Sequence, residues 1–176
     1  MPVSLAIWFV LVACAIAVIT DLRSRRIPNL LTAALALAAL TLHALQGPLS
    51  FGVACATLVG VLLLGFIAFS FGWLGGGDVK LLAAGGAALS LPDAVPFLVY
   101  TAVGGGLLAL VVAAASGRLR AVVTSAAMLL RTFAYKGTIA VAPSSGVTLP
   151  YAVAIAFGAG AVALSHTAAP FLRLPL

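Results

Sequence analysis

Residues 50–72 read SFGVACATLVGVLLLGFIAFSFG, and none of these 23 positions holds a charged side chain. A helix rises 1.5 Å per residue, so about 20 apolar residues cross a bilayer core of about 30 Å. The stretch therefore predicts a membrane-spanning helix, which indicates that the chain is an integral membrane protein.

Similar apolar runs recur along the 176 residues and predict an all-α, polytopic integral membrane protein. Five runs are long enough to cross a bilayer. A sixth, residues 79–91, is short, and we expect it to form a partly recessed helix after the glycine-rich loop, because irregular backbone at membrane depth is tolerated where protein covers it. About six transmembrane helices result. The five long runs are residues 3–20, 30–46, 50–72, 94–115 and 147–166.

The charge composition excludes a soluble domain. Only 7% of the residues are charged and 64% are hydrophobic, whereas a soluble domain carries about 25% charged residues. The formal net charge is +6, but the basic residues lie between the apolar runs. This placement identifies them as topology signals rather than a nucleic-acid-binding surface, so no nucleic-acid partner is expected.

The basic residues also predict an orientation. With the N-terminus outside, all Lys and Arg residues except Arg173 fall in inner loops, as the positive-inside rule requires. Asp21 and Asp78 then lie on the cytoplasmic face, and Asp93 lies on the other. The inner basic residues are Arg23, Arg25, Arg26, Lys80, Arg118, Arg120, Arg131 and Lys136.

Residues 116–146 form the longest stretch outside the candidate spans. Within it, residues 121–135 are apolar with basic flanks, which is typical of an interfacial helix on the anionic lipids of the inner leaflet; a seventh span is the alternative. Cys14 and Cys55 form neither a CxxC pair nor a metal-ligand spacing. The first run lacks a basic leader region and a clear cleavage site, so we expect a retained helix and one membrane-embedded domain over residues 1–176.

The chain has only three carboxylate side chains, Asp21, Asp78 and Asp93. Two of them adjoin apolar runs, within residues 21–29, DLRSRRIPN, and residues 75–80, GGGDVK. A carboxylate near hydrocarbon is costly and usually functional. Taken singly, Asp21 is explained as an interfacial charge beside arginines, and Asp78 as a helix N-cap after a glycine-rich turn. Taken together on one membrane face, they predict an aspartyl dyad.

Such a dyad has a defined chemistry. Two like charges a few ångströms apart do not both ionise readily, so the pair shares a proton. One carboxylate then acts as a base on water while the other donates a proton to the scissile carbonyl or the leaving amine. The positive helix end and Lys80 favour ionised Asp78, which we expect to ionise more readily than Asp21 unless the arginines after Asp21 outweigh its helix dipole.

The same residues resemble the motifs of a known family, the type IV prepilin peptidases. Residues 75–80 resemble its second catalytic motif, Gly-x-Gly-Asp, and residues 21–29 resemble its first, in which an Asp precedes a short basic stretch and Ile-Pro-Asn. The residues that carry the two motifs are Asp21, Pro28, Asn29, Gly75, Gly76, Gly77, Asp78 and Lys80.

A third stretch, residues 149–159, LPYAVAIAFGA, resembles the last helix of that family, which contains Pro-Tyr-Gly-Pro. Pro150 and Tyr151 are present, whereas Ala152 and Val153 stand where Gly and Pro are common. The role of this last helix is therefore open, and the pair of aspartates is not affected.

The resemblance implies an aspartic endopeptidase of the bacterial inner membrane, with Asp21 and Asp78 as its catalytic residues. It implies cleavage of the short basic leader from prepilin or pilin-like precursors, after a glycine and at the cytoplasmic face. Longer members carry an N-terminal domain with paired CxxC motifs and also methylate the new N-terminus. This chain lacks those cysteines and resembles the short, peptidase-only form of tight-adherence (Flp) pilus systems. No metal or cofactor is implied.

A small proton-coupled transporter or channel, with Asp21 and Asp78 as relay sites, is the alternative function. It would require acids near mid-membrane or broken helices in matched halves, and the sequence shows neither. Lys80 has two open interpretations, a snorkelling cation and a contact to an acidic group of the substrate. We expect Asp93 to be a capping or interfacial residue, and His43 and His166 to be interfacial.

Overall fold

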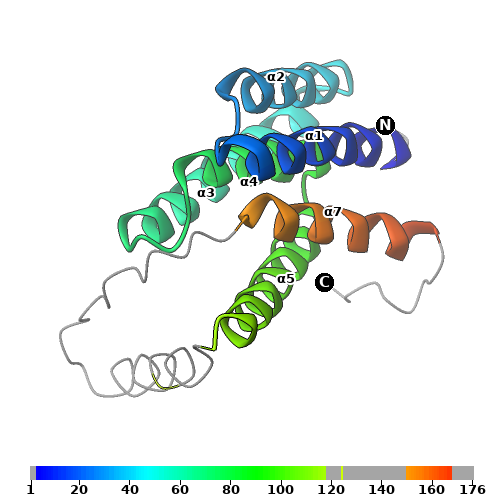
Figure 1. Cartoon of the computed structure of the whole chain (residues 1–176). Helices are drawn as coiled ribbons and strands as arrows, with labels where there is room; N and C mark the ends of the chain where they lie inside the picture. The colour runs from blue at the N-terminus through cyan, green and yellow to red at the C-terminus, as the bar shows by residue number, and fades with distance from the viewer. Residues whose placement is uncertain (1–2, 118–123, 125–149, 168–176) are drawn as a thin grey trace. The chain divides into compact units, whose positions relative to one another are not determined.

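The computed structural model of the chain describes residues 3–117, 124 and 150–167. These residues belong to two compact units, Met1–Gly105 with Pro150–Leu176, and Gly106–Leu149. Of the second unit, the structure describes the end of one helix, a turn at Gly117 and Thr124. In chain order, the helices are α1 (Val3–Ser24), α2 (Asn29–Leu45), α3 (Pro48–Ser70), α4 (Gly76–Leu89), α5 (Ala94–Ala115) and α7 (Tyr151–Thr167) (Figure 1).

The described residues form helices and no strand, which confirms the predicted all-α membrane class. α1, α3 and α5 are long and apolar enough to cross a membrane. α2 and α7 have 17 residues each, at the short end of the spanning range, and α4 has 14. Each helix falls on one of the six predicted runs, while the number that cross the bilayer stays a prediction.

Two other predictions are not decided by this structure. The interfacial helix expected over residues 121–135 lies outside the described residues, apart from Thr124. The single membrane-embedded domain over residues 1–176 also stays a prediction.

The short helix α4 lies at the centre of the first unit. It packs against α1, α2, α3 and α7, and every residue from Leu81 to Leu89 is buried. Its neighbours expose large apolar side chains instead, such as Leu64 of α3 at 64%. Apolar side chains on the outside and small, buried residues on the inside are the pattern of a helix bundle in lipid.

Glycines allow the neighbouring helices to approach α4 closely. A Cβ added to Gly65 of α3 would lie 2.6 Å from Cγ1 of Val79, and one added to Gly86 of α4 would lie 3.3 Å from Cγ2 of Val61. Carbon atoms prefer separations of about 3.5–4.0 Å. The close contact between α3 and α4 therefore depends on glycine, which has no Cβ, at these two positions.

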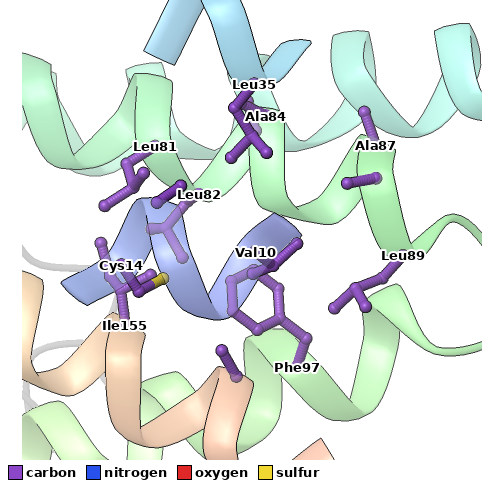
Figure 2. Close-up of a cluster of buried hydrophobic side chains, with 14 of the residues drawn as sticks. Val10, Cys14, Leu35, Leu81, Leu82, Ala84, Ala87, Leu89, Phe97 and Ile155 are labelled. Atoms are coloured by element: carbon purple, nitrogen blue, oxygen red, sulfur yellow. The ribbon is translucent and has the colours of Figure 1, made fainter. Parts of the chain in front are cut away.

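Figure 2 shows the core that surrounds α4, in which α1, α2, α4, α5 and α7 each contribute side chains. Phe97, Leu81 and Ile155 are the largest of the fully buried side chains. Because this core fixes α4 along its length, it also fixes the first turn of α4, where the glycine-rich motif stands. The labelled residues are Val10, Cys14, Leu35, Leu81, Leu82, Ala84, Ala87, Leu89, Phe97 and Ile155.

Candidate active site

Asp21 lies near the end of α1 and is half-buried. Its backbone carbonyl accepts the N–H of Arg25 at 2.9 Å, and Arg25 ends the helix with a φ of 52°, in the left-handed region. Its carboxylate oxygen Oδ2 is buried and has no hydrogen-bond partner in the described part of the chain. Buried polar atoms are seldom left unpaired, so this oxygen is suited to accept a hydrogen bond from a water molecule.

Asp78 is the third residue of α4 and is also half-buried. It does not occupy the N-cap position, which is held by Gly75; instead its Oδ2 reaches back and accepts the Gly75 N–H at 3.1 Å. A Cβ at Gly75 would lie 2.8 Å from the same oxygen. The first glycine of the motif therefore leaves room for the carboxylate and also donates a hydrogen bond to it.

The two carboxyl groups act on each other. The pKa of Asp78 is raised from 3.8 to about 6: burial is the largest cause, the hydrogen bond from Gly75 opposes the change, and the negative charge of Asp21 adds to it. Residues 57 positions apart in sequence thus lie within electrostatic range, on the first turn of α4 and the last turns of α1.

This direction is opposite to the expected effect of the helix start and Lys80, on which Asp78 was predicted to ionise more readily than Asp21. The positive end of α4 and the N–H of Gly75 do favour the carboxylate, but the burial of the group favours the neutral acid by more. In the structure Lys80 is held by Asn29, which is a neutral residue.

The turn between α1 and α2 packs against the glycine motif. A Cβ on Gly77 would lie 3.1 Å from Cβ of Ile27, so the backbone of α4 approaches this turn closely. Pro28 caps α2 with a φ of −62°, and its carbonyl accepts the N–H of Leu31 at 3.1 Å. The two sequence motifs are therefore neighbours in space.

A hydrogen bond across 51 residues joins the same two motifs. The Nζ of Lys80 donates to Oδ1 of Asn29 at 2.8 Å, and both side chains are exposed. Sequence reasoning selected both residues but did not predict that they pair. Of the two interpretations of Lys80 left open above, the structure supports neither directly, because the ammonium group has an internal partner.

Pro150 and Tyr151 bring the last helix to the site. Tyr151 is the first residue of α7, is half-buried, and lies within electrostatic range of Asp78. Its ring lies against Gly105 of α5, where a Cβ would come within 2.8 Å of the ring. Gly76 is exposed, and a Cβ added there would make only ordinary contact with Phe69, at 3.7 Å.

The third aspartate lies elsewhere. Asp93 follows the C-terminal end of α4, and its Oδ1 pairs with Nε2 of His166 at 3.0 Å. A cavity of about 390 Å³ lies at that same end and is lined by Asp93, His43 and Ser50, among others. His43 is buried and already bonds Ser50 and the carbonyl of Ala88. This cavity is therefore separate from the Asp21–Asp78 pair.

No group of three or more His, Cys, Asp or Glu side chains that could hold a metal ion occurs among the described residues. Cys14 and Cys55 are free thiols on different helices. The chemistry available at the pair is that of two carboxyl groups and a nearby phenol, which is proton transfer.

Comparison with known proteins gives one match. The model of the type IV leader peptidase family matches residues 8–110, which is more than half of the chain and includes Asp21 and Asp78. No curated protein and no solved structure matches the chain significantly. The match favours a peptidase over the transporter considered as the alternative, and it ends before Pro150 and Tyr151.

Proposed function

The chain belongs to the type IV leader peptidase family, and from this premise we propose that Asp21 and Asp78 are the catalytic pair of an aspartic endopeptidase. The observation that carries the proposal is the approach of two half-buried carboxyl groups from α1 and α4. The charge of Asp21 raises the pKa of Asp78, and Oδ2 of Asp21 is buried without a partner in the described part of the chain. Two carboxyl groups share a proton only when they lie close enough for the charge of one to oppose ionisation of the other.

The unequal surroundings of the two acids suggest their roles. Asp78 holds a proton below about pH 6, so it is assigned as the general acid, and Asp21 is assigned as the base. Asp21 takes a proton from water as the water oxygen attacks the scissile carbonyl carbon. Asp78 gives its proton to the departing amine as the C–N bond breaks, which leaves a carboxylic acid on the leader and a free amine on the product. Asp21 then carries the proton taken from water, and its transfer to Asp78 through solvent restores the starting state.

The proposed substrate is a prepilin or pilin-like precursor, cut after the glycine that ends its basic leader. Its apolar helix would lie against the exposed apolar faces of α1 and α3. The basic residues of the predicted inner loops support a site that faces the cytoplasm from a bacterial inner membrane.

The test is to incubate the detergent-purified protein with such a precursor and to identify the products by mass spectrometry. We expect a single cut after the leader glycine. Asp21→Asn and Asp78→Asn should each lower the rate by about a hundredfold to ten-thousandfold, the range that acid–base groups contribute. Circular dichroism should show unchanged helicity.

Asp93→Asn is the matched control, because it removes the one remaining carboxylate side chain from the opposite end of α4. It should retain cleavage. Full activity in Asp21→Asn or Asp78→Asn would refute the catalytic pair, and absence of any cut with several precursors would refute the proposed substrate.

A further inference from the structure

We infer that Asn29 is a positioning residue that holds the Lys80 ammonium group away from the Asp21–Asp78 pair, so that the pair keeps its shared proton. The inference deepens the proposed function of that pair and rests on it. The observation behind it is the hydrogen bond of 2.8 Å between Lys80 Nζ and Asn29 Oδ1, which links the two catalytic motifs.

The position of Asn29 relative to Asp21 is fixed by the backbone. α1 ends at Ser24, Arg25 turns the chain with a positive φ, and Pro28 sets the start of α2. Proline restricts its own φ, so the segment from Asp21 to Asn29 has little freedom. Asn29 therefore presents its amide oxygen at a defined place beside the end of α1.

The position of Lys80 is fixed from α4. Gly77 and Lys80 are three residues apart and lie on one face of the helix. Gly77 contacts Ile27, and Lys80 reaches Asn29, so this face meets the turn between α1 and α2. Asp78 stands between them in sequence, with its carboxylate directed back to Gly75. The ammonium group is thus anchored two residues from a carboxyl group that it does not bind.

Charge explains why this anchoring matters. A cation within about 4–6 Å of a carboxyl lowers its pKa by about one to three units, which would remove the proton from Asp78. The ammonium group of a lysine sits on a flexible four-carbon stem, so without an anchor it is able to move toward a nearby carboxyl group. The neutral oxygen of Asn29 binds the ammonium group without adding a charge of its own, whereas an acidic residue at this position would alter the titration of the pair.

Few titratable groups from the surrounding helices face Asp78. α1 contributes Asp21 and α7 contributes Tyr151. The titratable residue of α2, His43, lies at the other end of that helix, and α3 carries Cys55. Lys80 is consequently the cation of α4 that Asn29 holds. The other cations near the pair in sequence are the arginines of the neighbouring turn, Arg23, Arg25 and Arg26.

The chain allows a direct test, because it contains three aspartates and no glutamate. Protein labelled with ¹³C at the aspartate carboxyl carbon should give three carboxyl signals, assigned with Asp→Asn variants and followed by NMR from pH 3 to 9. We expect Asn29→Leu to lower the pKa of Asp78 by about one to three units. Asp93, at the other end of α4, is the internal control and should keep its titration.

Two further variants identify the cause. In the double variant Asn29→Leu with Lys80→Met, the Asp78 titration should return to that of the unaltered protein. Lys80→Met alone should leave it unchanged, because the ammonium group is already held away. An unchanged titration in Asn29→Leu, a shift that persists in the double variant, or a rise in Lys80→Met alone would each overturn the inference.

The titration needs no substrate, so its outcome is independent of whether the proposed cleavage is found. With a cleavable precursor, the descending alkaline limb of the kcat/KM profile should move to lower pH in Asn29→Leu by the same shift. It should move back in the double variant. A loss of activity with an unmoved limb would assign Asn29 a purely structural role and contradict the inference.

Discussion

Asp78 is subject to opposing influences that can be separated. The helix start and the N–H of Gly75 stabilise its carboxylate, whereas burial and the charge of Asp21 stabilise the neutral acid. Burial is the largest of these effects, which is why its pKa rises to about 6. A carboxyl group with this pKa is able to donate a proton at a pH where an ordinary aspartate is ionised.

The pH dependence of cleavage follows from this value. A raised pKa means that Asp78 is protonated below about pH 6 and loses its proton above it. Because kcat/KM reports the free enzyme, it should fall by about tenfold per pH unit on the alkaline side. Initial rates at low substrate concentration from pH 4 to 9 measure this limb. A kcat/KM that stays constant to pH 8 would contradict the role of Asp78 as proton donor.

At the residue scale, the sequence predicted the identity of the pair better than its ionisation. Scarcity of acids and their position beside apolar runs were enough to select Asp21 and Asp78, whose charges do interact; their catalytic role stays a prediction. The ionisation of Asp78 depends on how four helices bury α4, which no local pattern contains. The bond between Asn29 and Lys80 was missed for the same reason, since 51 residues separate them.

At the scale of elements, hydropathy predicted where each described helix lies. The length of the apolar run 79–91 predicted a short helix there, which is α4 (Gly76–Leu89). The sequence did not reveal that this shortest helix is the central one. The available signal was composition: α4 is rich in alanine and glycine, and small residues allow helices in a membrane to approach each other closely. A glycine is needed for this packing only where a neighbouring helix leaves no space for a side chain.

Two glycines of α3 provide a test of this distinction. A Cβ at Gly65 would meet Val79 at 2.6 Å, whereas a Cβ at Gly60 would have nothing within 4 Å. We expect Gly65→Ala to destabilise the fold by about 1–3 kcal/mol, the usual cost of overpacking. Gly60→Ala should be neutral or stabilising, because alanine is the better helix former. Thermal unfolding in detergent, followed by circular dichroism, compares the two.

The partner residue provides the control for this effect. Val79→Ala removes the methyl groups that the new Cβ would meet, so the double variant should be less destabilised than the sum of the two single variants. Equal midpoints for Gly65→Ala and Gly60→Ala would show that α3 and α4 separate without cost.

At the scale of the whole molecule, the membrane class follows from composition alone, and the family match agrees with it. The orientation in the membrane is predicted from other information than the membrane class. It depends on where the nine basic residues lie along the chain, and not on composition or packing. The structure adds that the Asp21–Asp78 pair and the Asp93–His166 pair lie at opposite ends of α4. The predicted orientation therefore places the first pair at the cytoplasm and the second outside.

Labelling of single cysteines tests this orientation. Starting from a variant without Cys14 and Cys55, Ser24→Cys marks the end of α1 beside Asp21, and Thr167→Cys marks the end of α7 beside His166; both positions are exposed. In spheroplasts, a membrane-impermeant maleimide should label Thr167→Cys at once and Ser24→Cys only after the membrane is opened. The cysteine-free parent should stay unlabelled. The reverse pattern would place the proposed catalytic pair outside the cell, against the distribution of basic residues in the loops. A leader that stays in the cytoplasm would then be inaccessible to Asp21 and Asp78.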